Sequence, residues 1–272
     1  MIKFFLKKNF CDIWDNLFFL ILSNIIPVAV VVGAYFGISY IGSINSYAPN
    51  IAFVVFSGIL MAVIFAWGAN ARKLADFNSP TFGLFFRSLV SLFFKGFIFG
   101  SLLAVLVLIS RVAILYYLNN FFNNSESSSF SYLSLFLAAV IGWFVIIVCI
   151  SMQWFVPFYF LQEENNMFKC LKKSFIIFFD NPGFSFFIFL HNIVLLVLTI
   201  VTFGLIPGVN GITLSCTNAL RLRLYKYDWL EEHEEYLNDR DKRNEVPWNE
   251  LIADDVESLG PRKFSSFIFP WK

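Results

Sequence analysis

Long, nearly uninterrupted apolar runs alternate with short polar segments along most of this chain. Five runs stand out, at residues 17–41, 51–69, 96–118, 132–161 and 184–204. Each has the roughly 20 residues that an α-helix needs to cross the ~30 Å hydrocarbon core of a bilayer, or more, and the run at 132–161 is long enough to tilt. The first exceeds the apolar region of about 7–15 residues in a signal peptide, so we expect it to stay attached. The pattern predicts five transmembrane helices, the fifth capped by Asp180 or Asn181 with Pro182 in its first turn.

The segment at 205–223 is harder to assign, because it is short, weakly apolar and interrupted by glycines. The basic residues favour a sixth span there. If both termini are cytoplasmic, the inner segments hold 19 of the 20 Lys and Arg residues, and the remaining one is Arg111. The positive-inside rule expects such a bias, although long tails cross membranes regardless of charge, so five spans stay open. We expect an all-α, polytopic membrane helix bundle of six transmembrane helices over residues 17–223, with both termini cytoplasmic.

Composition supports a membrane protein. The chain is 58% hydrophobic and 14% charged, whereas soluble domains carry about a quarter charged residues. A globular core could not bury this much apolar surface, so lipid is the expected solvent for much of the chain. The N-terminal segment 1–16 is basic and aromatic and is expected in the cytoplasm, against the anionic face of the cell inner membrane. Membrane lipid is thus a sufficient partner for the basic residues, and nucleic acid is not needed.

Residues 224–272 form a predicted cytoplasmic tail that is acidic and ends in aromatic side chains. A short helix is expected from Pro247 to Gly260, with one apolar face made of Trp248, Leu251, Ile252, Val256 and Leu259. The chain then closes on Phe267, Phe269 and Trp271, flanked by cations. Such a sequence suits a membrane interface, where aromatic rings sit at headgroup level. Packing against the protein's own helices and docking to a partner protein are the alternatives.

Few polar groups fall inside the predicted spans. No acidic residue lies in any of the six, which counts against a proton- or sodium-coupled carrier. Arg111 lies about seven residues, roughly 10 Å, from the outer end of its span. Its side chain either reaches the outer headgroups or faces the bundle interior and holds an anionic lipid or substrate group. His191 and Asn192 lie in the cytoplasmic half of the fifth span, and the histidine is expected to form a hydrogen bond between helices.

Two prolines interrupt the first and fourth spans, and each stands beside polar side chains. Pro27 frees the carbonyl of Ser23 and follows Asn24, while Pro157 frees the carbonyl of Gln153. One interpretation is a pair of kinked helices whose freed carbonyls are satisfied locally. The other is that both broken helices line a central cavity, at equivalent places of an inverted repeat such as many transporters contain.

Other chemistry is not apparent in the sequence. The four cysteines are widely separated and form no CxxC pair, so neither a disulfide framework nor a zinc site is expected. The chain contains no P-loop, GxSxG, HExxH or Rossmann glycine pattern. We therefore expect no cofactor, no metal and no enzymatic activity.

Three segments carry a resemblance to a known family. They are "IWDNLFFLILSNIIP" (13–27), "TFGLFFRSLVSLFFKGFIFGSLL" (81–103) and "FYFLQEENNMFKCLKKSFIIFFDNPGFSF" (158–186). They resemble the YesL-like bacterial membrane proteins, a family named for a domain of unknown function, in a spirochaete-type variant with tails ending in "FIFPWK". The resemblance implies six helices, an inner-membrane location and an association with carbohydrate uptake systems. It implies no catalytic residues.

Segment 162–183 lacks the spaced alanines and the glycine of the cytoplasmic loop by which sugar-importer permeases dock onto an ATPase. The chain is therefore not expected to be such a permease itself. The favoured hypothesis is a non-enzymatic accessory or regulatory membrane subunit whose tail recruits a partner, such as a transporter. The alternative is a small-solute transporter or the substrate-binding membrane subunit of one, using the kinked helices and Arg111.

Overall fold

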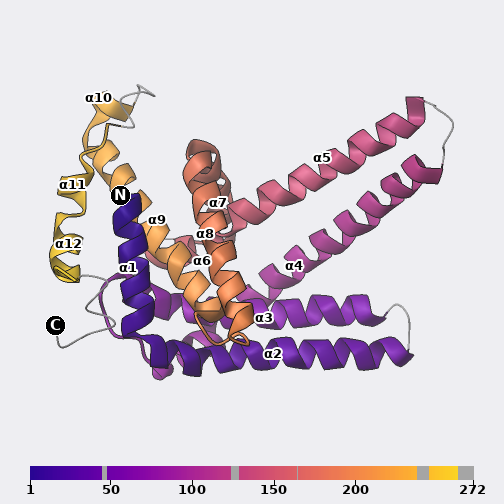
Figure 1. Cartoon of the computed structure of the whole chain (residues 1–272), viewed down its shortest axis with the longest axis horizontal. Coiled ribbons are helices and arrows are strands. Elements are labelled where there is room, and N and C mark those ends of the chain that lie inside the picture. Colours follow the sequence, from indigo (N-terminus) through magenta and orange to yellow (C-terminus); the bar gives the residue numbers. More distant parts are fainter. Residues whose placement is uncertain (45–47, 124–128, 164, 238–244, 263–272) are drawn as a thin grey trace.

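The computed structural model describes residues 1–44, 48–123, 129–163, 165–237 and 245–262. Helices make up the regular structure of this part of the chain, and it contains no strand. The helices are α1 (Ile2–Asp15), α2 (Leu17–Ile44), α3 (Ala48–Ala75), α4 (Phe82–Asn123), α5 (Ser129–Met152), α6 (Phe155–Leu161), α7 (Met167–Asp180), α8 (Pro182–Val201), α9 (Gly208–Glu232), α10 (Glu234–Leu237), α11 (Trp248–Leu251) and α12 (Ala253–Leu259) (Figure 1).

Five helical segments are long and apolar enough to cross a membrane, and they indicate a membrane protein. They are α2, α3, α4, residues 132–161, and α8. These are the five runs predicted from the sequence, and Pro182 lies in the first turn of α8 as expected. Asn181 occupies the N-cap position, but its side chain makes no capping hydrogen bond. The predicted sixth span at 205–223 is not among the five within the described residues. At 42 residues, α4 is about 63 Å long, twice the ~30 Å hydrocarbon core.

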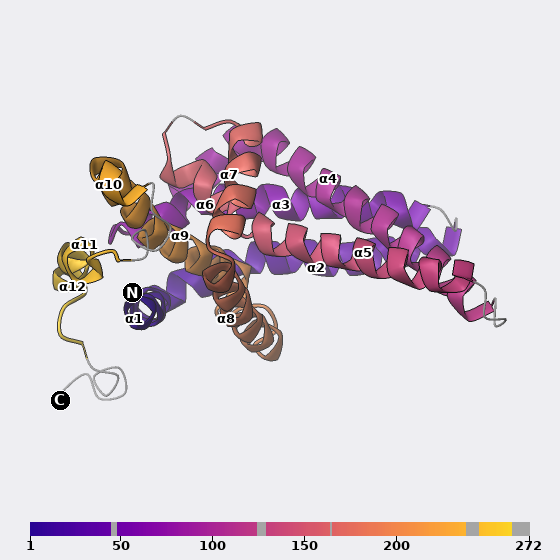
Figure 2. The ribbon, with the colours of Figure 1, turned by 90° about the horizontal axis from the view of Figure 1, so that it is seen from above.

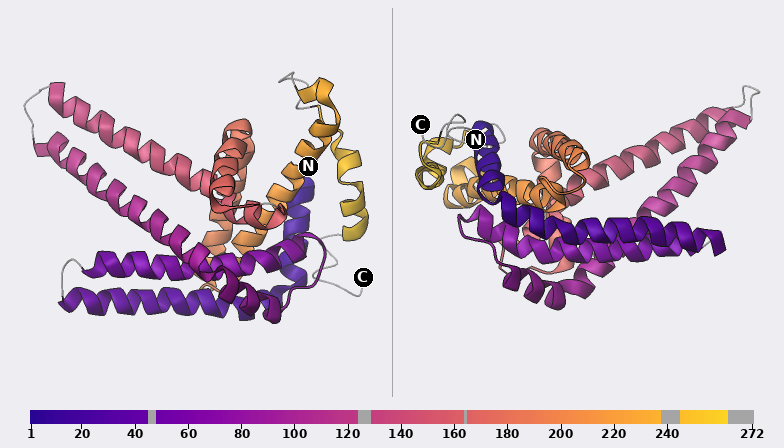
Figure 3. Two further views of the ribbon diagram at one scale, coloured as in Figure 1. Left: turned by 180° about the vertical axis from the view of Figure 1, so that it is seen from behind. Right: turned by 60° about the horizontal axis from the view of Figure 1, so that its bottom comes forward.

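Two antiparallel hairpins form the elongated part of the molecule. Helices α2 and α3 lie side by side, α4 and α5 form the second pair, and the two hairpins diverge away from the end that carries α1 (Figures 1 and 3). They are joined where α4 crosses α3 at glycines. A Cβ atom at Gly96 would lie 2.6 Å from the Cα of Ala62, and one at Gly100 would lie 2.6 Å from the carbonyl oxygen of Ser57. Only glycine permits this backbone approach, which is how small residues bring membrane helices together.

Helices α8 and α9 form a third hairpin that crosses the first one instead of running beside it (Figures 1 and 2). Its turn lies against the first half of α2, because a Cβ atom at Gly204 would be 2.5 Å from the side chain of Val28. Asn24, which also contacts this turn, is only seven residues from the start of α2, or about 10 Å along its axis. The segment predicted as a sixth span is thus part of a hairpin that reaches only partway along α2.

Helix α9 is polar and yet mostly buried. It contacts α1, α2, α3, α6 and α8. Its buried positions include the polar side chains Asn210, Thr213, Ser215, Thr217 and Asn218. Neighbouring helices surround α9, so its polar side chains lie against protein. A lipid-facing helix would need apolar side chains at these positions.

Helix α1 and the described part of the tail pack at one end of the molecule. Lys7 Nζ donates a hydrogen bond to the carbonyl of Gly260 (3.3 Å), and Arg262 forms an ion pair with Asp15. Residues 248–259 are helical as predicted but divided at Ile252, whose side chain is buried. The left-handed backbone of Gly260 (φ 70°) ends α12. This part of the tail lies on the protein's own helices.

The predicted aromatic anchor of Phe267, Phe269 and Trp271 lies outside the described residues, and its role stays a prediction.

Candidate functional site

The site begins at a break between α5 and α6. Gln153 and Trp154 separate α5 from α6, and Pro157 is the third residue of α6. The first few N–H groups of a helix have no hydrogen-bond partner within it, so the N–H that proline lacks costs no helical hydrogen bond here. The interruption predicted from Pro157 is therefore present. Gln153 Nε2 donates to the carbonyl of Ser185 at 2.9 Å, and Trp154 Nε1 donates to its Oγ at 3.2 Å. The break is thereby fixed to the start of α8.

A pair of amides continues from this point. Asn192 Nδ2 donates to Cys216 Sγ (3.1 Å) and to Gln153 Oε1 (3.5 Å). Because Gln153 uses its nitrogen toward Ser185, its oxygen must face Asn192, which orients both amides. Oδ1 of Asn192 is buried and has no hydrogen-bond partner in the described part of the chain. The 3.5 Å bond is long beside the usual 2.9–3.0 Å or so, so it is the weakest link of this series.

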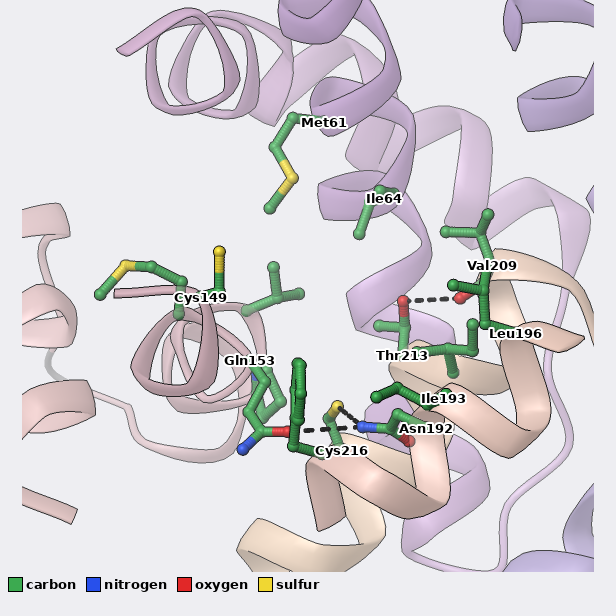
Figure 4. A pocket seen from close by; sticks show the side chains of 15 residues that line it. Met61, Ile64, Cys149, Gln153, Asn192, Ile193, Leu196, Val209, Thr213 and Cys216 are labelled. Atoms are coloured by element: carbon green, nitrogen blue, oxygen red, sulfur yellow. Dashed lines mark hydrogen bonds between the residues drawn. The ribbon is translucent and has the colours of Figure 1, made fainter. Parts of the chain in front are cut away.

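These two amides border a cavity of about 290 Å³ between α3, α5, α6, α8 and α9. Its walls are apolar and include Met61, Ile64, Met152, Pro157, Leu196 and Val209. Figure 4 shows Gln153, Asn192 and Cys216 gathered at one side, with Met61 and Ile64 across from them. Among the described residues that line it, none is acidic or basic. The cavity offers an apolar ligand a few hydrogen-bonding groups, as small-molecule pockets usually do.

The structure brings Gln153, Pro157 and Asn192 together, but it places Pro27 and Asn24 elsewhere. Helix α2 continues through Pro27 without a break. Asn24 Nδ2 donates to the carbonyls of Leu205 (3.0 Å) and Pro207 (2.8 Å), and its Oδ1 accepts from the backbone N–H of Asn210 (3.2 Å). Asn24 therefore fastens the α8–α9 turn to α2. Of the two predicted proline breaks, one lines the cavity and the other does not.

Asn24 also explains the glycine that opens α9. Gly208 has a left-handed backbone (φ 71°), and a Cβ atom there would lie 2.1 Å from the Asn24 side chain. A side chain at this position would displace Asn24 from the turn that it binds.

His191 belongs to a second polar cluster, which contains helix α1. Its Nε2 lies 3.2 Å from Asn9 Nδ2. Asn218 donates to Asp12 Oδ2 at 2.8 Å, and Asp12 pairs with Lys8 at 3.1 Å. The hydrogen bond expected of His191 between helices is present. The ion pair was missed by sequence reasoning, although Lys8 and Asp12 stand at i,i+4 spacing on one face of a helix.

Burial governs the electrostatics of that ion pair. Lys8 is 1% exposed and Asp12 is 8% exposed. Burial lowers the pKa of the Lys8 ammonium, and the charge of Asp12 opposes this shift. Burial likewise raises the pKa of Asp12, opposed by Lys8 and by the hydrogen bond from Asn218. The Lys8 ammonium also lies 3.5 Å from the ring centroid of Phe77, which adds a cation–π contact.

Arg111 lies apart from both polar groups. It is exposed on α4 and borders a separate concavity with Asn50 of α3.

No protein-family model matches this chain, and no curated protein or solved structure is significantly similar to it. The resemblance to YesL-like proteins stays an expectation drawn from the three quoted segments. The chemistry of the cavity is therefore argued from its own residues.

Proposed function

We propose that this protein is a non-enzymatic membrane subunit that binds an apolar molecule bearing one hydrogen-bonding group. The observation that carries the proposal is the cavity of about 290 Å³ with apolar walls and the amides of Gln153 and Asn192 at its edge. A ligand hydroxyl inserted between the two amides would replace their 3.5 Å contact with two shorter hydrogen bonds. Long-chain alcohols and related lipids have this chemistry.

Photolabelling tests the proposal. Purified protein in detergent is exposed to a long-chain alcohol bearing a photoreactive group, and labelled peptides are mapped. We expect labels on residues 149–157 and 189–196, on either side of the cavity. Ile64→Trp would fill the cavity and remove most of the labelling. The matched control is Leu190→Trp, at a position on α8 that is 46% exposed and is not part of the described lining. Equal labelling in both variants would contradict the proposal.

We further propose that both ends of the chain are cytoplasmic and that the protein resides in an inner membrane. Two observations support this: the contacts between α1 and the tail at Lys7 and Arg262, and the concentration of basic residues in the inner segments. A reporter fused after Lys272 should be active on the cytoplasmic side. Activity on the opposite side would exclude this topology.

Ligand binding suits either an accessory subunit or the substrate-binding subunit of a transporter. The accessory role, with a carbohydrate uptake system among the candidates for a partner, follows from the family resemblance. Co-purification after crosslinking, with the full chain and with a chain ending at 244, tests it. An unchanged set of partners would count against recruitment by the tail.

A further inference from the structure

Arg111 is an arginine on a helix that is apolar enough to cross a membrane. It is exposed on α4, and it forms no hydrogen bond or ion pair within the described ranges of the chain. The side chains around it include Leu108, Ile109 and Val112. A guanidinium in such surroundings is costly unless an anion or water meets it.

The depth of Arg111 follows from the helix rise. On α3, Asn50 and Arg72 are 22 residues apart, or about 33 Å. With Arg72 at the inner boundary of a ~30 Å hydrocarbon core, Asn50 lies near the outer boundary, and so does Arg111, which borders the same concavity as Asn50.

Arg111 also borders a concavity of suitable shape. The concavity has a volume of about 720 Å³, and its polar members are Asn50, Arg111, Tyr116 and Tyr117. Tyrosines are typical of the membrane interface, where the ring is in apolar surroundings and the hydroxyl reaches water. The rest of the lining is apolar.

An apolar groove continues inward from this point. It has a volume of about 240 Å³ and lies between α3 and α4, bordered by Phe53, Ser57, Leu103 and Val107. Its α3 residues begin one turn beyond Asn50, so the polar concavity and the apolar groove follow one another along the same two helices. A cation at the interface and an apolar groove leading inward match a molecule with an anionic head and a hydrocarbon chain.

We propose that Arg111 binds the phosphate of an anionic phospholipid in the outer leaflet, with one acyl chain in the groove between α3 and α4. The planar guanidinium fork fits phosphate oxygens in bidentate fashion. Asn50 and Tyr116 supply further donors at the rim of the concavity. Inorganic phosphate shares the head chemistry but leaves the groove empty, which is why the lipid is the preferred source. This site is separate from the cavity bordered by Gln153 and Asn192, and it does not rest on the function proposed for that cavity.

Native mass spectrometry tests this site with the full-length protein in an uncharged detergent. Phosphatidylglycerol is titrated into wild type, Arg111→Ala, Arg111→Lys and Arg87→Ala. Arg87 is the matched control, since it is also an exposed arginine of α4 but borders neither of the two concavities described here. We expect one tightly held lipid on wild type and Arg87→Ala. Arg111→Ala should bind it about tenfold to a hundredfold more weakly, and Arg111→Lys should be intermediate.

Two further arms identify the source of the phosphate. Diacylglycerol, which lacks phosphate, should not be retained, and millimolar inorganic phosphate should not displace phosphatidylglycerol. Displacement by inorganic phosphate would overturn the lipid assignment. Equal losses in Arg111→Ala and Arg87→Ala, or equal retention of diacylglycerol, would overturn the site itself. Unchanged thermal unfolding of each variant shows that the fold is intact.

Discussion

The two halves of this molecule place polar and apolar side chains in opposite ways. Along the hairpins of α2–α5, large apolar side chains point outward, with Phe94 75% and Val112 67% exposed. At the end where α1, α9 and α12 meet, charged and amide groups are inside, and Lys8 and Asn218 are each 1% exposed. The first half has lipid as its solvent, while the second half supplies its own polar surroundings. In neither half, therefore, does the hydropathy of a side chain indicate whether it is buried inside the protein. Apolar side chains are exposed in the first half, and polar side chains are buried in the second.

The two halves also differ in what holds them together. Lipid tails are as apolar as the side chains that they contact, so the hairpins gain little from burying apolar surface and depend on close packing at Gly58, Gly96 and Gly100. The polar end depends on hydrogen bonds and ion pairs whose removal leaves a buried group without a partner. Substitutions should therefore destabilise the two halves for different reasons, by loss of close packing in the hairpins and by loss of a buried partner at the polar end.

The largest effect is expected at the buried ion pair. Asp12→Leu leaves the Lys8 ammonium buried without its partner and should lower the free energy of unfolding by about 3–5 kcal/mol. The double variant Lys8→Met/Asp12→Leu removes both charges and should recover most of that loss. Chemical unfolding in detergent measures all three proteins. A double variant as unstable as Asp12→Leu would show that the pair does not explain the effect.

Close packing in the hairpins is tested next. Gly96→Leu places a side chain where a Cβ atom alone would lie 2.6 Å from the backbone of Ala62, so α3 and α4 must separate, at a cost of about 3 kcal/mol. The matched control is Gly142→Leu on α5, where a Cβ atom has no neighbour within 4 Å. Thermal unfolding should be shifted in the first variant and nearly unchanged in the second. Similar shifts in both would argue against glycine packing as the cause.

A moderate effect is expected where the two halves join. Asn24→Ala removes three hydrogen bonds to the α8–α9 turn and should destabilise the protein by about 2 kcal/mol. Hydrogen exchange should increase at residues 202–210 more than elsewhere. Ser39→Ala on the same helix is the control, because the Ser39 hydroxyl bonds to the carbonyl of Tyr35 in its own helix, in an exposed position. Uniform exchange along the chain would contradict a local role for Asn24.

The smallest effect concerns pH. Burial lowers the pKa of Lys8 below its ordinary 10.5, so the unfolded chain binds more protons than the folded protein between the two values, and stability rises with pH there. Each pH unit that separates the folded-state pKa from the unfolded-state pKa is worth about 1.4 kcal/mol. Since Asp12 opposes the lowering, Asp12→Leu should show a steeper rise toward alkaline pH than wild type. A parallel pH dependence in the two proteins would mean that Lys8 does not titrate in this range.

Sequence reasoning found the half that faces lipid and missed the organisation of the other. The five spans follow from apolar runs, and backbone chemistry agrees with the break before Pro157 and with the start of α8 at Pro182. The same chemistry fails at Pro27, where α2 continues without a break. Gly96 and Gly100 are spaced as a GxxxG pair in an apolar helix, and this signal could have indicated the contact of α4 with α3.

The polar end could not be derived in the same way. Hydropathy counts side chains one at a time, whereas the burial of α9 depends on partners more than 180 residues away, such as Asn24 for Asn210 and Asp12 for Asn218. The cavity was foreseen in part, since Gln153, Pro157 and Asn192 were singled out by polarity or backbone chemistry. Cys216 and Thr213 were missed because segment 205–223 was assigned as a span from the distribution of basic residues, which says nothing about which of its side chains face a cavity.

The polarity of α9 has a consequence for how the chain enters the membrane during synthesis. A helix with Asn210, Ser215 and Asn218 on its surface has poor solubility in lipid and would be rejected as a free segment. Helices α1, α2 and α3, which hold its partners, leave the ribosome first. The order of the chain is thus also an order of assembly, in which the early helices form the surroundings that admit the late one. A circular permutant that began with α9 would place that helix in the membrane before its partners existed.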